Sequence, residues 1–145
     1  MVDSMENKIQ KFTDLRVWQE GHSIAIEIYK LTKSFPKDEL FALVNQMRRC
    51  AVSITSNIAE GFSRQSKKEK VQFYSISQGS LTELHNQLLI ARDVGYMNQQ
   101  LCDTLVGRLW NLNISMSALI SRVKGNTSSS LPSTNYRLPT TLHTK

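Results

Sequence analysis

The fold is decided by the stretch VNQMRRCAVSITSNIAEG, residues 44–61. At ~100° per residue on a helix, its polar side chains lie within roughly 80° of arc, and its apolar side chains lie opposite. The polar stripe consists of Asn45, Arg49, Ser53, Ser56 and Glu60. The apolar stripe, at the spacing of a bundle seam, consists of Leu40, Val44, Met47, Ala51, Ile54 and Ile58. We therefore expect a helix that packs on a core with one side and faces a second surface with the other.

Length and composition favour one cytoplasmic domain. With 145 residues and 40% hydrophobic content, the chain can bury a core without disulfides or metals. Cys50 and Cys102 have no CxxC partner, so we expect reduced, buried core residues in a cytosolic protein. No stretch approaches the ~20 apolar residues of a membrane span. The polar N-terminus also lacks the apolar core of a signal peptide, so we expect a soluble protein.

Local signals mark the first two helices. The first is expected over about 13–34, because Pro36 disfavours helix in the residue before it. The second is expected over about 38–60 and should stop at Gly61, which can adopt a left-handed conformation. An apolar side chain at every third or fourth position supports both helices.

The last two helices have clear caps. Ser66 and Glu69 form a capping box, so the third helix should begin at 67 and continue to 95. Asn98 is the expected N-cap of the fourth helix, and Gly125 should end it. The third helix has an expected seam of Phe73, Ile76, Ser80, Leu84, Leu88 and Ala91. The small residues Ser77, Gly79 and Ser80 should let a neighbouring backbone approach closely.

These segments predict an all-α fold, an antiparallel up-down-up-down four-helix bundle over 13–125. Residues 1–12 should form a flexible N-terminus, and the Ser-, Thr- and Pro-containing tail 126–145 should be disordered.

The apolar residues exceed what one bundle needs. The first helix carries two stripes, one with Leu15, Trp18, His22, Ala25, Ile26 and Tyr29 and one with Val17, Ile24, Ile28 and Leu31. We expect Ile24 and Ile28 to lie off the main seam, as Trp110 and Ile114 do on the fourth helix. Surplus apolar stripes on several helices indicate a subunit interface and a homo-oligomer.

A basic cluster surrounds the expected start of the third helix. The formal net charge of the chain is +6, which permits a nucleic-acid or acidic protein partner. Cations at a helix start interact unfavourably with the positive end of the helix dipole. A bound phosphate would interact favourably with both the dipole and the cations. The cluster therefore suits a sugar-phosphate backbone, without reading base sequence, or is a solvated surface loop. Its residues are Arg64, Lys67, Lys68 and Lys70.

The two adjacent arginines of the second helix point differently. Arg48 should face the side that holds Phe41, Val52 and Ala59, and we include it among the candidate nucleic-acid-binding residues. Arg49 should form an ion pair with Glu60 or with Glu39 of a neighbouring helix or subunit, or else contact RNA. The candidate structural or interface residues are Arg49, Ser53, Ser56, Asn57 and Glu60. Of these, Asn57 and Glu60 at the helix end should satisfy backbone groups.

Enzyme signatures are missing from the sequence. It has no P-loop, GxGxxG or HExxH motif and no Glu-x-x-His pair. His22 and His85 have no second histidine at ligand spacing and are expected to be core or surface residues. We therefore expect no catalytic residue, no metal site and no cofactor.

The chain resembles the bacterial four-helix-bundle proteins often encoded within intervening sequences of 23S rRNA genes, over roughly 12–124. The residues that carry the resemblance are Trp18, Tyr29, Phe35, Pro36, Glu39, 46–49, Ser53, 56–61, 79–81, Glu83 and Leu84. It departs from the family pattern at Ala42, Cys50 and Thr55, where many members carry Gly, Ala and Pro. Lacking that proline, the second helix should be less kinked at Thr55. The resemblance implies a ring, commonly a pentamer, without known catalysis. The chain is also distantly similar to accessory proteins of diversity-generating retroelements, basic pentamers that bind a reverse transcriptase and nucleic acid.

Two functions follow as hypotheses. The first is a nonenzymatic homo-oligomeric bundle that associates with RNA or a ribonucleoprotein through repeated basic loops. The second is a protein-interaction scaffold, such as an accessory subunit of a reverse transcriptase, that uses the Arg49 stripe and outer apolar residues. No membrane partner is expected.

Overall fold

The computed structural model describes residues 8–125, and this part of the chain is all-α, without a strand. Its four long helices are α1 (Arg16–Thr32), α2 (Asn45–Ser63), α3 (Lys67–Asp93) and α4 (Gln99–Lys124). Short helical turns η1 (Phe12–Asp14), η2 (Lys37–Glu39) and η3 (Leu40–Val44) precede α1 and α2. The predicted disordered tail and residues 1–7 of the predicted flexible N-terminus lie outside the described residues.

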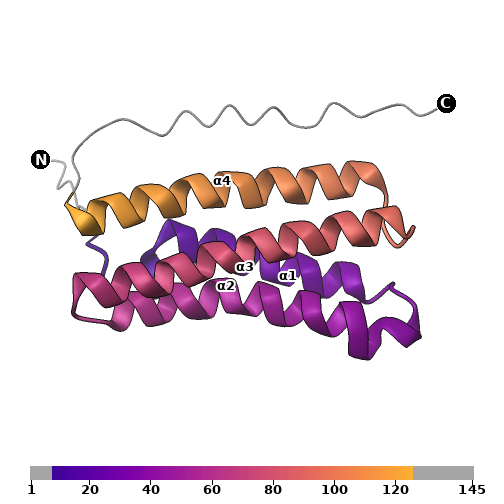
Figure 1. Ribbon diagram of the computed structural model, residues 1–145, viewed down its shortest axis with the longest axis horizontal. Coiled ribbons are helices and arrows are strands. Elements are labelled where there is room, and N and C mark those ends of the chain that lie inside the picture. Colours follow the sequence, from indigo (N-terminus) through magenta and orange to yellow (C-terminus); the bar gives the residue numbers. More distant parts are fainter. Residues whose placement is uncertain (1–7, 126–145) are drawn as a thin grey trace, which may run out of the picture.

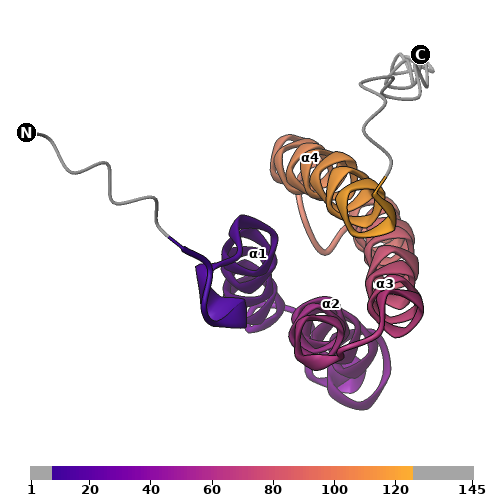
Figure 2. The same ribbon diagram turned by 90° about the vertical axis from the view of Figure 1, so that its left-hand side faces the viewer.

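The four helices lie side by side along the long axis, and each connection lies at an end of the molecule (Figure 1). Seen from one end, α2 lies between α1 and α3, and α4 lies against α3 (Figure 2). Side chains from all four helices meet in one core, where the fully buried residues include Ile24, Ile54, Leu84 and Met116. The predicted four-helix fold is confirmed.

The core face of α2 is the predicted apolar stripe, except at its start. Val44, Met47 and Ile54 are buried, whereas Leu40 is 48% exposed. The helix breaks at Ala42, which has φ −119° and ψ −106°. Because this break changes the direction of the chain, Leu40 leaves the register of the stripe and Phe41 becomes 90% exposed. By contrast, α2 continues without interruption through Thr55, where no proline interferes.

The assignment of the two stripes on α1 was wrong in part, although Leu15 and Ala25 of the first stripe are buried. Ile24 and Ile28, expected off the main seam, are fully buried, whereas Ile26 and Tyr29 are 44% and 41% exposed. The physical reason lies at Gly21 on the buried side of the helix. A Cβ added there would lie 3.1 Å from Thr55 Cγ2. The missing side chain therefore lets this side of α1 approach α2 closely.

Small residues bring α2 and α3 together, as predicted for Ser77 and Ser80. Ser77 Oγ donates to the Ile54 carbonyl oxygen over 2.8 Å, and the hydroxyl oxygens of Ser53 and Ser80 are 2.8 Å apart. The thiol of Cys50 donates to the Ser80 carbonyl oxygen over 3.0 Å. Gly79 plays no part, because no heavy atom lies within 4 Å of a Cβ added there.

The predicted seam of α3 is wrong near its start. Phe73 is half-buried and Ile76 is exposed, while the next residues, Tyr74 and Ser77, are buried. Tyr74 packs against Gly61 of α2, where a Cβ would lie 2.7 Å from Tyr74 Cε1. This close contact turns the first half of α3 by one residue relative to the predicted stripe.

The predicted caps Ser66, Asn98 and Gly125 are confirmed. Other predicted helix ends are shifted, because α1 spans Arg16–Thr32 rather than 13–34, α2 begins at Asn45 rather than 38, and α3 ends at Asp93 rather than 95. The Ser66 side chain accepts from the Glu69 backbone N–H, and that of Asn98 accepts from the Leu101 backbone N–H. Gly125 ends α4 with φ +77°. Gly61 does not end α2, which continues to Ser63.

Lys70 caps the end of α2 from the neighbouring helix. Its ammonium group donates to the carbonyl oxygens of Gly61 and Phe62 over 3.3 and 2.7 Å. The Gly61 carbonyl oxygen also accepts from the Arg64 backbone N–H over 3.3 Å, whereas the Phe62 carbonyl lies in the last helical turn, where intrahelical partners are missing. A cation there also interacts favourably with the negative end of the helix dipole, so Lys70 stabilises this end of α2.

Replacing Gly61 by Ala should destabilise the bundle by about 1–3 kcal/mol, because the new methyl group overlaps the Tyr74 ring. Urea unfolding followed by circular dichroism measures this change. The matched control is Gly79→Ala, which adds a methyl group in open space on a helix and should stabilise by about 0.5–1 kcal/mol. Equal effects of the two substitutions would contradict the packing described for Gly61.

Lys70→Gln should lower the free energy of unfolding by about 1 kcal/mol, because charged hydrogen bonds to two carbonyl groups are lost. Lys68→Gln, in the same turn but without such contacts, should change it by less than about 0.5 kcal/mol. Thermal unfolding at one salt concentration compares the two variants. If Lys68→Gln costs as much as Lys70→Gln, the capping role is wrong.

Candidate nucleic-acid interface

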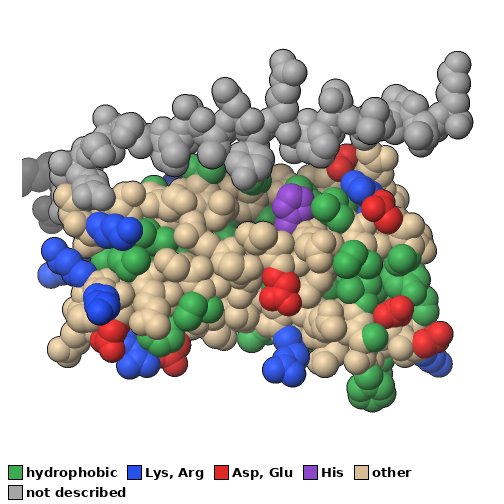
Figure 3. Space-filling view, viewed as in Figure 1, with side chains coloured by type: hydrophobic (Ala, Val, Ile, Leu, Met, Phe, Trp, Pro, Cys, Tyr) green, Lys and Arg blue, Asp and Glu red, His purple; other side chains and the backbone are tan. Residues whose placement is uncertain are grey.

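One end of the bundle carries the net positive charge of the described residues. The start of α1, the connection between α2 and α3, and the last turn of α4 lie together at this end (Figure 1), where Lys and Arg side chains gather on the surface (Figure 3). We call it the basic end. Its cations are Lys8, Lys11, Arg16, Arg64, Lys67, Lys68, Lys70, Arg122 and Lys124, and its acids are Asp14, Glu60 and Glu69.

The rest of the described chain is electrically balanced. Its seven cations are Lys30, Lys33, Lys37, Arg48, Arg49, Arg92 and Arg108. Its seven acids are Glu20, Glu27, Asp38, Glu39, Glu83, Asp93 and Asp103. The charge is therefore distributed along the axis of the bundle as one basic end and one neutral remainder.

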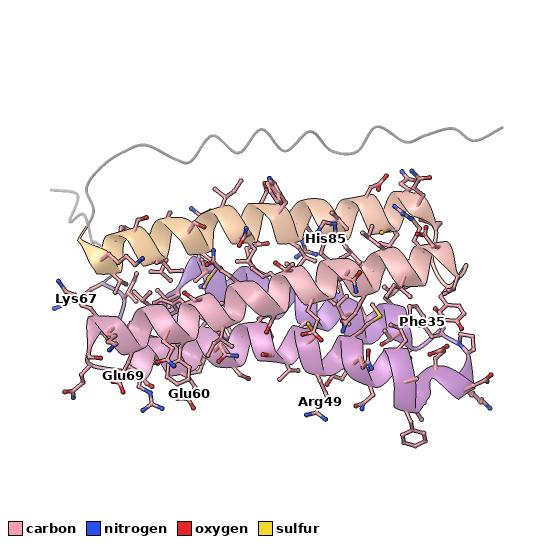
Figure 4. The ribbon with its side chains drawn as sticks, viewed as in Figure 1. Phe35, Arg49, Glu60, Lys67, Glu69 and His85 are labelled. Atoms are coloured by element: carbon pink, nitrogen blue, oxygen red, sulfur yellow. The ribbon has the colours of Figure 1, made fainter. Side chains whose placement is uncertain are left out.

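The predicted basic cluster divides into engaged and free cations. Arg64 pairs with Glu60 over 3.2 Å and lies above the Phe73 ring, and Lys70 caps α2. Lys67 and Lys68 are exposed and have no hydrogen bond or ion pair with any residue in 8–125. Lys67 extends from the end of the bundle, whereas Glu60 and Glu69 lie nearer its side (Figure 4). Two of the four predicted cations are therefore free to meet a ligand.

Sequence reasoning missed Arg122 and Lys124, and with them Lys11 and Arg16. These residues are far from the predicted cluster in the sequence, but the fold brings their elements to the same end (Figure 1). The predicted up-down order of the helices could have identified these residues. In such an order, the starts of the first and third helices share one end with the ends of the second and fourth.

Four of the five residues of the polar stripe of α2 face outward, as predicted, and the fifth, Ser53, contacts Ser80 of α3. Asn45, Arg49, Ser56 and Glu60 are exposed, and Arg49 points away from the bundle (Figure 4). Within the described chain, the expected ion pairs of Arg49 do not form. Glu60 pairs with Arg64 instead, so it does not satisfy a backbone group.

The second expected partner of Arg49 is also occupied. A carboxylate oxygen of Glu39 accepts from the Tyr96 hydroxyl over 2.9 Å, and the other accepts from the Leu43 backbone N–H over 3.2 Å. Through these contacts Glu39 joins the α1–α2 and α3–α4 connections at the end opposite the basic end. Arg49 has no hydrogen bond or ion pair with the described residues.

Two candidate interface residues lie toward α3. Ser53 hydrogen-bonds with Ser80, and Asn57 Nδ2 donates to the Ser53 carbonyl oxygen over 2.8 Å. The expectation that Asn57 satisfies a backbone group is thus confirmed. Ser53 thus contacts α3, and Asn57 bonds to Ser53 within α2, so both side chains have partners.

Arg48 joins α1 and α2 beside a groove. Its Nε donates to Thr32 Oγ1 over 2.9 Å, and its guanidinium lies 4.8 Å from the centre of the Tyr29 ring. These contacts place Arg48 away from the four cations with which it was grouped. The groove has a volume of about 430 Å³ and is lined by Tyr29, Asn45, Arg48, Arg49, Val52, Ser53 and Ser56.

The buried thiols are protonated at neutral pH. Burial, and then the charge of Glu83, raise the pKa of Cys50 to about 12, and burial raises the pKa of Cys102. Both cysteines are free and buried, as predicted. Residues 8–125 contain no group of three or more His, Cys, Asp or Glu side chains that could hold a metal ion. None of the described helices is long and apolar enough to cross a membrane.

Comparison with known proteins identifies the family of the chain. The family model described as "23S rRNA-intervening sequence protein" matches residues 13–117. A crystal structure of a protein of unknown function from the S23 ribosomal protein family of Bacteroides thetaiotaomicron is similar in fold, with a TM-score of 0.67 and 20% sequence identity. The likeness covers 72% of this chain and 95% of that one. No curated protein gave a significant match. Because the family model matches more than half of the chain, from η1 into α4, this chain belongs to the 23S rRNA-intervening sequence protein family.

Proposed function

We propose that the chain is a nonenzymatic, antiparallel up-down-up-down bundle that binds RNA or a ribonucleoprotein in the cytoplasm. In this proposal the chain forms a homo-oligomeric ring, a pentamer by family resemblance. The observation that carries the RNA-binding role is the basic end, which holds the net charge of residues 8–125. Lys67 and Lys68 at that end have no partner among the described residues.

The chemistry of the basic end suits phosphates rather than base edges. Its free groups are ammonium and guanidinium ions, which contact phosphate oxygens irrespective of sequence. The start of α3 also presents backbone N–H groups beside Lys67 and Lys68, and a phosphate there would interact favourably with the helix dipole. One of these groups, the Glu69 backbone N–H, already donates to the Ser66 side chain in the helix cap. A single basic end therefore offers few phosphate contacts, and its affinity should be weak.

Repetition of the basic end around a ring would convert weak contacts into useful affinity. When one RNA spans several subunits, the second and later contacts form at high effective concentration. Each phosphate contact releases counterions, so the total affinity should fall steeply with salt.

The outer face of α2 is the best candidate for the subunit contact. The groove beside it combines Arg49, which has no partner in the described chain, with the exposed side chains of Tyr29 and Val52. A neighbouring subunit that supplies a carboxylate and apolar side chains would satisfy both features. Covering this face leaves the basic end, at the end of the bundle axis, open to RNA.

A second candidate function, a protein-interaction scaffold, is favoured by Phe41. This side chain is 90% exposed beside the break at Ala42 and lies at the end opposite the basic end. An exposed aromatic residue of this kind is a common anchor in protein interfaces. A reverse transcriptase as the partner follows only from the distant resemblance noted above.

Changing both Lys67 and Lys68 to Glu should weaken binding to structured RNA by about tenfold or more. It should also reduce the slope of log affinity against log salt by about 2 per contacting subunit. Filter binding over a series of salt concentrations measures both quantities. The matched control is Lys33→Glu with Lys37→Glu, the same charge change near the opposite end. Equal weakening by the two double variants would contradict a localised site.

The unmodified chain should be an oligomer at micromolar concentration when RNA is absent. Arg49→Glu should shift it toward smaller species, because like charges would then meet across the subunit contact. Native mass spectrometry resolves the species and gives the subunit number. Arg122→Glu, which makes the same change away from the groove, should leave the assembly intact. A monomeric unmodified chain would refute the ring.

A further inference from the structure

A column of three aromatic rings lies on the surface at the start of α1. The Trp18 and His22 rings are stacked, with centroids 4.7 Å apart and planes 16° apart. Phe12 meets Trp18 edge to face, with centroids 5.5 Å apart. Phe12 is 37% exposed, His22 is exposed and Trp18 is half-buried. The column is therefore preformed and open to solvent on its outer side.

The column lies at the edge of the core, against which Trp18 packs. Trp18 and His22 are four residues apart, so their rings lie above one another on one face of the helix. Leu15 and Ala25 of the same stripe are buried in the core beside Ile24 and Ile28, whereas His22 is exposed. Trp18 therefore anchors the column on the bundle, and the exposed rings of Phe12 and His22 remain available to a ligand.

The column begins at the basic end. Lys11 directly precedes Phe12, and Arg16 opens α1 two residues before Trp18. The start of α1 and the α2–α3 connection both face the viewer in Figure 2, so flat rings and free cations share one end of the molecule. This charge favours a polyanionic occupant over an apolar protein surface.

A single nucleic-acid strand combines the two features that this end can recognise. Its phosphates suit the cations, and its unpaired bases have flat faces that stack on aromatic side chains without regard to sequence. A duplex keeps its base faces inside the helix and could use only the charges. We propose that the column of Phe12, Trp18 and His22 stacks unpaired bases of single-stranded RNA while the basic end holds its phosphates. This inference rests on the proposed RNA-binding function and names its ligand class.

The test uses Trp18 as a reporter in a Trp110→Phe background, where it is the sole tryptophan of the chain. Three probes are compared: a single-stranded oligoadenylate, an RNA duplex of the same length, and inorganic polyphosphate, which has charge but no bases. The oligoadenylate should quench Trp18 emission and bind about tenfold more tightly than the duplex, since only its unpaired bases can stack on the rings. Polyphosphate should bind through charge and leave the emission unchanged.

Variants separate stacking from charge. His22→Ala removes an exposed ring, so it should preserve the fold and weaken oligoadenylate binding about tenfold while polyphosphate binding stays constant. His85→Ala on α3 is the matched control and should change neither affinity. Circular dichroism of each variant confirms that the helices remain folded.

Three outcomes would overturn the inference while leaving the proposed function in place. These are equal affinity for single strand and duplex, equal loss of oligoadenylate and polyphosphate binding in His22→Ala, and RNA binding without any change in Trp18 emission. If RNA binds without changing Trp18 emission, and this emission depends on protein concentration, then a second copy of the chain covers the column. If none of the three probes binds, the proposed function and the inference both fail.

Discussion

The close approach of α2 to α3 is the constraint on which the other features depend. It is possible only because Gly61 faces Tyr74 and because two serines occupy positions where larger side chains would hold the helices apart. Hydroxyl groups buried in this seam find carbonyl and hydroxyl partners, so the polar atoms carry little desolvation penalty. The seam fixes the rotation of α2 about its axis. With that rotation set, the apolar stripe faces the core, and the polar stripe faces outward except at Ser53, which lies in the seam.

The same rotation determines where the charges lie. The connection from Ser63 to Lys67 is short, so α3 starts close to the end of α2, and Lys70 reaches back to the last carbonyl groups of α2. This leaves Lys67 and Lys68 at the tip of the bundle beside the ends of α1 and α4. Helix packing thus turns a modest net charge, spread through the sequence, into a localised basic surface. The stacked rings at the start of α1 border this surface.

Local signals in the sequence were sufficient for much of the fold. The caps Ser66, Asn98 and Gly125 act within one helical turn, so their roles could be predicted without knowledge of neighbouring helices. The choice between two apolar stripes on α1 could not be made in this way, because it depends on which stripe Gly21 allows to approach α2. Gly61 was misread for the same reason. Its lack of a side chain serves a contact with another helix rather than a local turn.

The candidate site was predicted in part, and the divided result has a physical cause. The clustering of cations around a helix start identified Lys67 and Lys68, but it could not show that Lys70 is occupied by α2 or that Arg48 lies against Tyr29. Ultraviolet crosslinking of the assembled protein to RNA, with mass-spectrometric mapping of the crosslinked peptides, tests the central claim of a single RNA-binding end most directly. The account predicts crosslinks within 8–22, 64–70 and 122–125. Crosslinks concentrated in 33–41 and 92–101, at the opposite end, would contradict it.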